Sequence, residues 1–153
     1  MLRCSGLQPD YALAGRSGTL RGMPRPTCSR CQRPLGHCLC PLIPVLESRT
    51  RVLILQHPSE VGHALNTARL AALGLRNAEL RVGEVFDDLP QLLAQSDYRA
   101  CLLFPGDEAV VLTGYVPKEK PLLLVVPDGT WRKARKLLHL NPSLAALPRV
   151  SPV

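Results

Sequence analysis

Two short runs of consecutive aliphatic residues constrain the fold of this chain more than any other feature of its sequence. Residues 52–55 and 122–126 contain only valine, leucine and isoleucine, without the alternation of apolar and polar positions that a half-exposed strand shows. Strands of this kind are buried on both faces, which is typical of a parallel sheet covered by helices. Both runs are far shorter than the roughly 20 residues that a membrane-spanning helix needs, so we expect a soluble protein without a membrane partner.

The rest of the α/β pattern follows from periodicity. Segments rich in leucine and β-branched residues predict further strands, and apolar residues at helical spacing predict helices between them. The predicted strands are Arg51–Gln56, Ala78–Val82, 100–104 and 122–126, and the predicted helices are 63–73, 89–95 and 130–140. The predicted fold class is therefore α/β, with a mostly parallel sheet and helices on both faces.

The last predicted helix is amphipathic and basic. The apolar face, which we expect to pack into the protein, consists of Trp131, Ala134, Leu137 and Leu138. The opposite face carries Arg132, Lys133, Arg135 and Lys136. Asn141-Pro142 and Pro148 end the helix and predict an irregular tail.

The formal net charge of +7 points to a polyanionic partner. Fifteen arginines against four lysines supply the positive charge, and the arginine guanidinium suits bidentate phosphate contacts and stacking on bases. Net charge speaks to non-specific association and not to fold, and many small basic proteins bind no nucleic acid. The charge by itself leaves both interpretations open.

Composition divides the chain into three parts. Residues 1–24 mix glycine, serine, arginine and proline without periodicity, which predicts a disordered basic leader. Residues 25–44 are rich in cysteine, and residues 45–153 carry the α/β pattern. The first residues contain no apolar stretch of about 7–15 residues of the signal-peptide kind, so we expect a cytoplasmic protein.

Four cysteines lie close together in the second part and predict a small zinc-ribbon-like segment. They are Cys28, Cys31, Cys38 and Cys40. In a cytosolic protein such a cluster is more often a metal site than a disulfide framework, and four thiolates suit a closed structural zinc site. His37 is an alternative ligand, and the alternative for the whole segment is a loop of reduced, unligated cysteines. Cys101 stands alone in a predicted strand and is expected to be a small buried hydrophobe.

A second group of residues follows the apolar run 122–126. Asp128-Gly129-Thr130-Trp131 joins this strand to the last helix, at the end of the sheet where ligands of α/β proteins bind. The Asp128 carboxylate suits a general base or a partner for an ammonium group, Gly129 lets a ligand approach the backbone, and Thr130 can cap the helix. The alternative is a plain capping turn with Trp131 in the core.

These four residues resemble the Asp-x-Thr-Trp signature of the DTW-domain family. Other segments resemble motifs of the same family, in the same order along the chain. They are Cys28-x-x-Cys31-x-x-Pro34-x-x-x-Cys38-x-Cys40, His57-Pro58-x-Glu60, Asn66-Thr67-x-Arg69-Leu70, Asn141-Pro142-x-Leu144 and Leu147-Pro148-Arg149. The resemblance covers about residues 25–150.

The resemblance implies an activity and a fold. Bacterial members of the family are tRNA-uridine aminocarboxypropyltransferases, which use S-adenosyl-L-methionine as donor and release methylthioadenosine. Their fold is related to the SPOUT RNA methyltransferases, an α/β domain with a knotted cofactor site. Family members usually continue well beyond the segment that ends at Arg149, so we expect this chain to be truncated at its C-terminus, with an incomplete α/β domain.

The resemblance also implies roles for individual residues. Asp128 is the expected catalytic residue, as general base or as anchor for the donor's ammonium group. The expected donor-binding residues are Gly129, Thr130, Trp131, His57 and Glu60, although a histidine followed by proline at a strand end is as often just a turn. Arg132, Lys133 and Lys136 are expected to contact tRNA phosphates.

Two alternative functions stay open at this point. One is a non-catalytic RNA-binding module, in which the zinc ribbon and the basic helix hold tRNA. The other is a SPOUT-type RNA methyltransferase. The reaction products distinguish the three: methylthioadenosine marks aminocarboxypropyl transfer, adenosylhomocysteine marks methylation, and neither marks binding alone.

Overall fold

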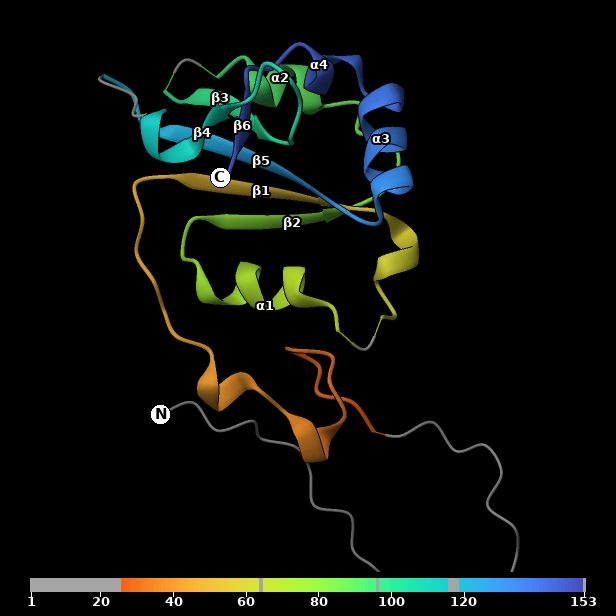
Figure 1. The fold of residues 1–153 in the computed structure, drawn as a ribbon. Coiled ribbons are helices and arrows are strands. Elements are labelled where there is room, and N and C mark those ends of the chain that lie inside the picture. The colour runs from red at the N-terminus through yellow and green to blue at the C-terminus, as the bar shows by residue number, and fades with distance from the viewer. Residues whose placement is uncertain (1–25, 64, 96, 116–118, 153) are drawn as a thin grey trace, which may run out of the picture. The chain divides into compact units, whose positions relative to one another are not determined.

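A computed structural model describes residues 26–152 apart from 64, 96 and 116–118 (Figure 1). The predicted leader, residues 1–24, lies outside the described residues. The chain divides into two compact units, Met1–Leu42 and Ile43–Val153. In the described part of the first unit there are two short 3-10 helices, η1 (Leu35–His37) and η2 (Cys40–Leu42); η1 ends just before Cys38, and η2 begins at Cys40.

The second unit is built on a six-stranded sheet in which every described pairing is parallel. The strands lie in the order β2-β1-β5-β3-β6-β4. Their bounds are β1 Arg51–Gln56, β2 Ala78–Val82, β3 Arg99–Leu103, β4 Val110–Val111, β5 Leu122–Asp128 and β6 Arg149–Ser151. The predicted α/β class and parallel sheet are confirmed, and the two aliphatic runs form the neighbouring strands β1 and β5.

Helices cover both faces of this sheet, as predicted. Helix α1 (Thr67–Gly74) lies on one face, and α2 (Leu89–Leu93) and α4 (Pro142–Ala145) lie on the other (Figure 1). On the second face the main core joins alternate residues of β1, β5 and β3 to α2, α3 (Trp131–Leu140) and α4. Leu53, Leu55 and Leu102 are fully buried there, and each such side chain stabilises the fold by roughly 1.5–3 kcal/mol.

The first helix begins later than the sequence pattern predicted. We expected a helix over 63–73, whereas α1 begins at Thr67. The Asn66 side chain accepts a hydrogen bond from the backbone N–H of Arg69 at 3.2 Å and so caps the helix. The residues before Asn66 form a 3-10 helix, η3 (Pro58–Glu60), and a turn.

The predicted irregular tail after 140 is wrong. Residues Pro142–Ala145 form α4, and Arg149–Ser151 form β6, which pairs with β3 and β4 inside the sheet. Both elements are too short to show a periodicity, and β6 is defined by strands that lie far from it in sequence. The two-residue strand β4 went unpredicted for the same reason.

Trp131 also differs from expectation. Ala134, Leu137 and Leu138 are buried as predicted, but Trp131 is 59% exposed and does not belong to the core. It is the first residue of α3, so it lies past the end of the sheet against which the rest of the helix packs. No helix among the described residues is long and apolar enough to cross a membrane.

A candidate ligand site at the carboxyl ends of the strands

The central strands end side by side, at the place where α/β sheets bind ligands. β1 and β5 pair in register up to Gln56 and Asp128. The chain leaves β1 toward α1 on one face and leaves β5 toward α3, which packs on the other face. The two connections therefore diverge at this edge, which is the arrangement that opens a crevice beyond the strand ends.

Asp128 is held there by a buried amide. The Gln56 side chain is 1% exposed, and its Nε2 donates to Asp128 Oδ2 at 2.7 Å and to Asn66 Oδ1 at 3.0 Å. The Asn66 amide donates back to Gln56 Oε1 at 3.4 Å. Sequence reasoning assigned no role to Gln56, whose only signal was a polar residue at the end of an aliphatic run, and it quoted Asn66 only as part of a family motif.

Ion pairs join α3 to the segments that follow β1 and β2. Glu60 Oε1 lies 2.8 Å from Lys133 Nζ, and Glu84 lies 2.8 Å from Lys136 Nζ and 2.7 Å from His57 Nε2. The hydrogen bond from Lys133 lowers the pKa of Glu60, and the hydrogen bond from Lys136 lowers that of Glu84. His57, Glu60, Lys133 and Lys136, which we expected to bind ligands, thus all have partners within the protein.

A small cavity lies beside the turn formed by residues 128–131, on the side away from Gln56. It has a volume of about 180 Å³, and Phe104, Gly129 and Trp131 are among its lining residues. The Phe104 and Trp131 rings meet edge to face, with centroids 5.4 Å apart and planes at 75°. Such a cavity offers apolar and aromatic surface to a flat ligand.

Asp128 does not line this cavity. It lines a second, largely apolar space of about 270 Å³ beneath α1, together with Val52, Ile54 and Val126. The predicted catalytic carboxylate and the predicted donor-binding Trp131 therefore lie on two sides of the same turn. Gly129 lies between them.

Gly129 has a packing reason that sequence reasoning did not find. A Cβ at this position would lie 3.1 Å from Lys133 Cβ and 3.5 Å from His57 Cβ. The missing side chain thus lets α3 approach the end of β1. Thr130 precedes α3 as its N-cap residue, but its side chain makes no capping hydrogen bond, so the predicted side-chain cap is wrong.

The cysteine cluster in the first unit fits a metal ion. The thiol sulfurs of Cys28, Cys31, Cys38 and Cys40 all lie within 4.8 Å of one another, and His37 is not part of the group. Backbone hydrogen bonds from Cys31 and Arg30 lower the pKa of Cys28 to about 6, whereas burial raises the pKa of Cys40, so the argument for a metal rests on the geometry of the four sulfurs. Four such ligands suit a closed, structural zinc site.

Comparison with known proteins assigns the chain. A family profile described as the DTW domain matches residues 25–151. The chain belongs to the DTW domain family. It is 33% identical to tRNA-uridine aminocarboxypropyltransferase 2 of Mus musculus, over 94% of this chain and 55% of the relative. It is 32% identical to the protein of the same name in Drosophila melanogaster, over 82% of this chain and 53% of the relative.

The similarity extends to plants at lower identity. The Arabidopsis thaliana protein tRNA-uridine aminocarboxypropyltransferase A is 28% identical, over 76% of this chain and 52% of the relative. The chain thus spans about half the length of these curated relatives. No solved structure matches it, so its relation to the SPOUT fold stays an expectation.

The DTW signature has a divided geometry in this member of the family. Asp128 turns toward Gln56 and α1, whereas Trp131 projects beside Phe104 on the opposite side. Because Gly129 has no side chain, the turn that carries Asp128 and Trp131 can lie close to the end of β1. The signature therefore marks the turn between the aromatic cavity at the carboxyl ends of the strands and the apolar space beneath α1.

Proposed function

We propose that this DTW domain transfers the 3-amino-3-carboxypropyl group of S-adenosyl-L-methionine to a uridine of tRNA. The observation that carries the proposal is the position of the signature turn. It joins a hydrogen-bonded carboxylate and an aromatic cavity at the ligand-binding edge of the sheet, in a chain similar to transferases named for this reaction. We place the protein in the cytoplasm, where cysteines stay reduced and available to zinc.

The chemistry sets what the protein has to supply. A uridine ring nitrogen attacks the methylene carbon next to the sulfonium, the carbon–sulfur bond breaks, and its electron pair stays on the sulfur of methylthioadenosine. The nitrogen loses its proton, and a general base typically contributes about 10²–10⁴-fold to such a step. Because the sulfonium activates three carbons, orientation decides which of them reacts.

In our proposal, different residues at the strand ends bind the donor, accept the proton and hold the signature turn in position. Trp131, Phe104 and Gly129 hold the apolar part of the donor in the aromatic cavity. Asp128 accepts the proton, and the 2.7 Å hydrogen bond from Gln56 fixes the direction of its carboxylate. His57 and Glu60 act indirectly. Glu60 pairs with Lys133 of α3, and His57 pairs with Glu84, which also pairs with Lys136, so these contacts hold α3 and the signature turn in position.

The exposed face of α3 is the proposed tRNA contact. Arg132 and Arg135 are exposed and form no ion pair within the described part of the chain. Lys133 and Lys136 lie on the same helix, but Glu60 and Glu84 already neutralise much of their charge. We therefore expect the arginines to carry more of the phosphate binding than the lysines.

The four cysteines are proposed to hold one zinc ion through their thiolates. A closed set of four protein ligands leaves no position for substrate, so the metal would fold the segment and take no part in the transfer. The arrangement also fits the alternative of an RNA-binding module. Catalysis must therefore be tested directly.

Product analysis tests the proposal. The protein is incubated with tRNA and S-adenosyl-L-methionine, and the nucleoside products are separated and identified by mass. Methylthioadenosine together with an aminocarboxypropylated uridine supports transfer. Adenosylhomocysteine with a methylated base would replace the proposal by a methyltransferase. Specific tRNA binding without either product, and without donor binding, would leave an RNA-binding module.

A further inference from the structure

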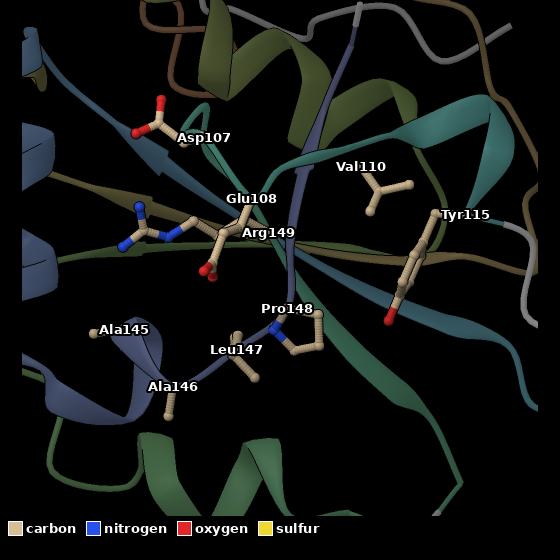
Figure 2. A pocket seen from close by; sticks show the side chains of 9 residues that line it. All are labelled: Asp107, Glu108, Val110, Tyr115, Ala145, Ala146, Leu147, Pro148 and Arg149. Carbon is tan, nitrogen blue, oxygen red and sulfur yellow. The ribbon is translucent and has the colours of Figure 1, made fainter.

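A second cavity lies away from the signature turn, at the edge of the sheet beside β4 and β6. It has a volume of about 620 Å³, which is within the usual range of small-molecule sites. Its charged lining residues are Arg149, Asp107 and Glu108, and Leu147 and Tyr115 add apolar surface. Figure 2 shows the three charged side chains on one side of the cavity and Tyr115 on the other.

Arg149 is held in place without a carboxylate. Its guanidinium carbon lies 5.8 Å from the centroid of the Phe104 ring, and it forms no ion pair within the described residues. A Cβ at Gly106 would come within 2.9 Å of Arg149 Nη1, so the glycine lets the guanidinium lie against the loop that follows β3. The half-buried cation is thus fixed in position with hydrogen-bond donors left over.

That same loop brings negative charge to the cavity. Asp107 and Glu108 come directly after Gly106, and both line the space that Arg149 enters (Figure 2). Neither carboxylate forms an ion pair with a residue in the described ranges. The cavity therefore presents opposite charges that do not neutralise each other by direct contact.

Tyr115 lines the cavity with its ring. Its hydroxyl is buried, so the ring and not the hydroxyl is what Tyr115 offers to a ligand. The charged groups open to a ligand are therefore those of Arg149, Asp107 and Glu108. A small ligand that carries both charges satisfies these three side chains.

We propose that this cavity binds the α-amino-acid end of the donor, with the α-carboxylate on Arg149 and the ammonium group at Asp107 and Glu108. The proposal rests on the function proposed above. Phe104 connects the two sites, because its ring contacts Trp131 in the aromatic cavity and Arg149 here. A donor anchored at both ends of this path presents its aminocarboxypropyl arm, and not its methyl group, in a fixed direction. The arrangement leaves Asp128 free for the proton.

Binding of two donor fragments tests this assignment. S-Adenosylhomocysteine carries the amino-acid end, and methylthioadenosine lacks it. Calorimetry or a fluorescence titration should show that Arg149→Gln weakens S-adenosylhomocysteine by about tenfold or more, because a charge-assisted bidentate contact is lost. Methylthioadenosine should bind the variant within about twofold of wild type. Arg76→Gln is the matched control, since this exposed arginine pairs with Glu47 outside the cavity.

A second pair of substitutions guards against a folding defect. Asp107→Asn with Glu108→Gln changes only exposed side chains and should also weaken S-adenosylhomocysteine alone. If Arg149→Gln melts at a much lower temperature than wild type, this double variant decides the matter. An analogue of S-adenosylhomocysteine without the α-carboxylate should be insensitive to Arg149→Gln, which a merely structural role of Arg149 would not predict.

The contrary outcomes are distinct. Equal weakening of both fragments, or of neither, overturns the assignment of the amino-acid end while the proposed function stands. If the wild-type protein binds neither fragment at concentrations that saturate a donor site, the proposed function fails and this inference fails with it.

Discussion

Gln56 shows how one buried amide can organise the end of a sheet. Its side chain reaches Asp128 on β5, 72 positions away in sequence, and Asn66 before α1, so the ends of two strands and the start of a helix meet in one hydrogen-bonded group. Loss of hydrogen bonds from a buried amide is expensive, because the amide group stays away from water. The amide therefore acts on stability and on the direction of the Asp128 carboxylate together.

Replacing Gln56 separates these two effects. Gln56→Leu leaves Asp128 and Asn66 without their partner and should lower the free energy of unfolding by about 1–3 kcal/mol. Gln56→Glu places a second carboxylate beside Asp128, which raises the folded-state pKa of the pair. The loss of stability in this variant should be full at pH values above the raised pKa, shrink as the pH falls through it, and be absent below the ordinary carboxyl pKa. Urea unfolding at several pH values measures the free energy of unfolding of both variants. A loss of stability in Gln56→Glu that does not depend on pH would contradict the pairing of the two carboxylates.

Asp128 itself is expected to matter for transfer more than for folding. Asp128→Asn keeps an oxygen that can accept the Gln56 hydrogen bond, so unfolding free energy should change by no more than about 1 kcal/mol. Removal of the base should lower single-turnover transfer by on the order of a hundredfold while tRNA affinity stays close to wild type. Transfer at the wild-type rate would make Asp128 a structural residue of the strand end.

At this scale the sequence allowed part of the site to be predicted. The Asp128–Trp131 turn was located correctly at a strand end, because an aliphatic run followed by turn residues is a local signal. The pairing of Gln56 with Asp128 was not predictable, since it joins residues separated by 72 positions and depends on the register of β1 against β5. The exposure of Trp131 was missed because helical spacing alone does not tell where the sheet ends.

At the scale of elements, α3 depends on carboxylates from two other segments. Lys133 and Lys136 lie one helical turn apart; Lys133 reaches Glu60 in η3 after β1, and Lys136 reaches Glu84 after β2. The sequence predicted the helix and its basic face from periodicity. It did not predict that Glu60 and Glu84 lie under that face, because loop positions carry no periodic signal. Strands β1 and β2 were predicted at their observed bounds, since their signals are local.

These ion pairs predict acid sensitivity. The folded-state pKa values of Glu60 and Glu84 lie below the ordinary value of 4.5, so their stabilising effect is complete above that pH and is lost as the pH falls through the lowered values. Glu60→Gln should reduce the melting temperature by roughly 2–4 °C at pH 7 and by nothing at the acid end of the range. Glu119→Gln, an exposed carboxylate, serves as control. A constant difference between wild type and Glu60→Gln across pH would exclude the electrostatic explanation.

The cysteine segment predicts a metal-dependent element. Protein purified without added metal should contain about one zinc per chain by elemental analysis, and Cys38→Ser should lose most of it and make residues 26–42 sensitive to protease. Cys101→Ala is the control, because burial raises the pKa of Cys101 to about 11 and the residue lies in β3. Less than about a tenth of a zinc per reduced, folded chain would contradict a structural site.

At the scale of the whole molecule, the fold shows which of the basic side chains behind the net charge of +7 are available to a partner. Some of the basic side chains are used internally: Arg51 and Arg81 pair with Glu79, and two lysines of α3 pair with glutamates. The charge that remains unpaired on α3 is that of Arg132 and Arg135, beside the carboxyl ends of the strands. Composition predicted a polyanionic partner, but only the three-dimensional arrangement indicates which cations are free to meet it.

The dependence of tRNA affinity on salt tests this arrangement. If arginine–phosphate contacts dominate, the logarithm of the association constant should fall steeply and linearly with the logarithm of salt concentration, with a slope near the number of phosphates neutralised. Arg132→Ala with Arg135→Ala should weaken binding and reduce the slope by about two. Lys133→Ala with Lys136→Ala should change the slope less, because removal of each lysine also frees a glutamate that was neutralised. Arg76→Ala is the control. Arg76 lies just ahead of β2 and pairs with Glu47, so its replacement should leave the slope unchanged. A nearly flat salt dependence of the wild type would remove the electrostatic interpretation, and equal effects of the two double variants would show that the ion pairs under α3 open when tRNA binds.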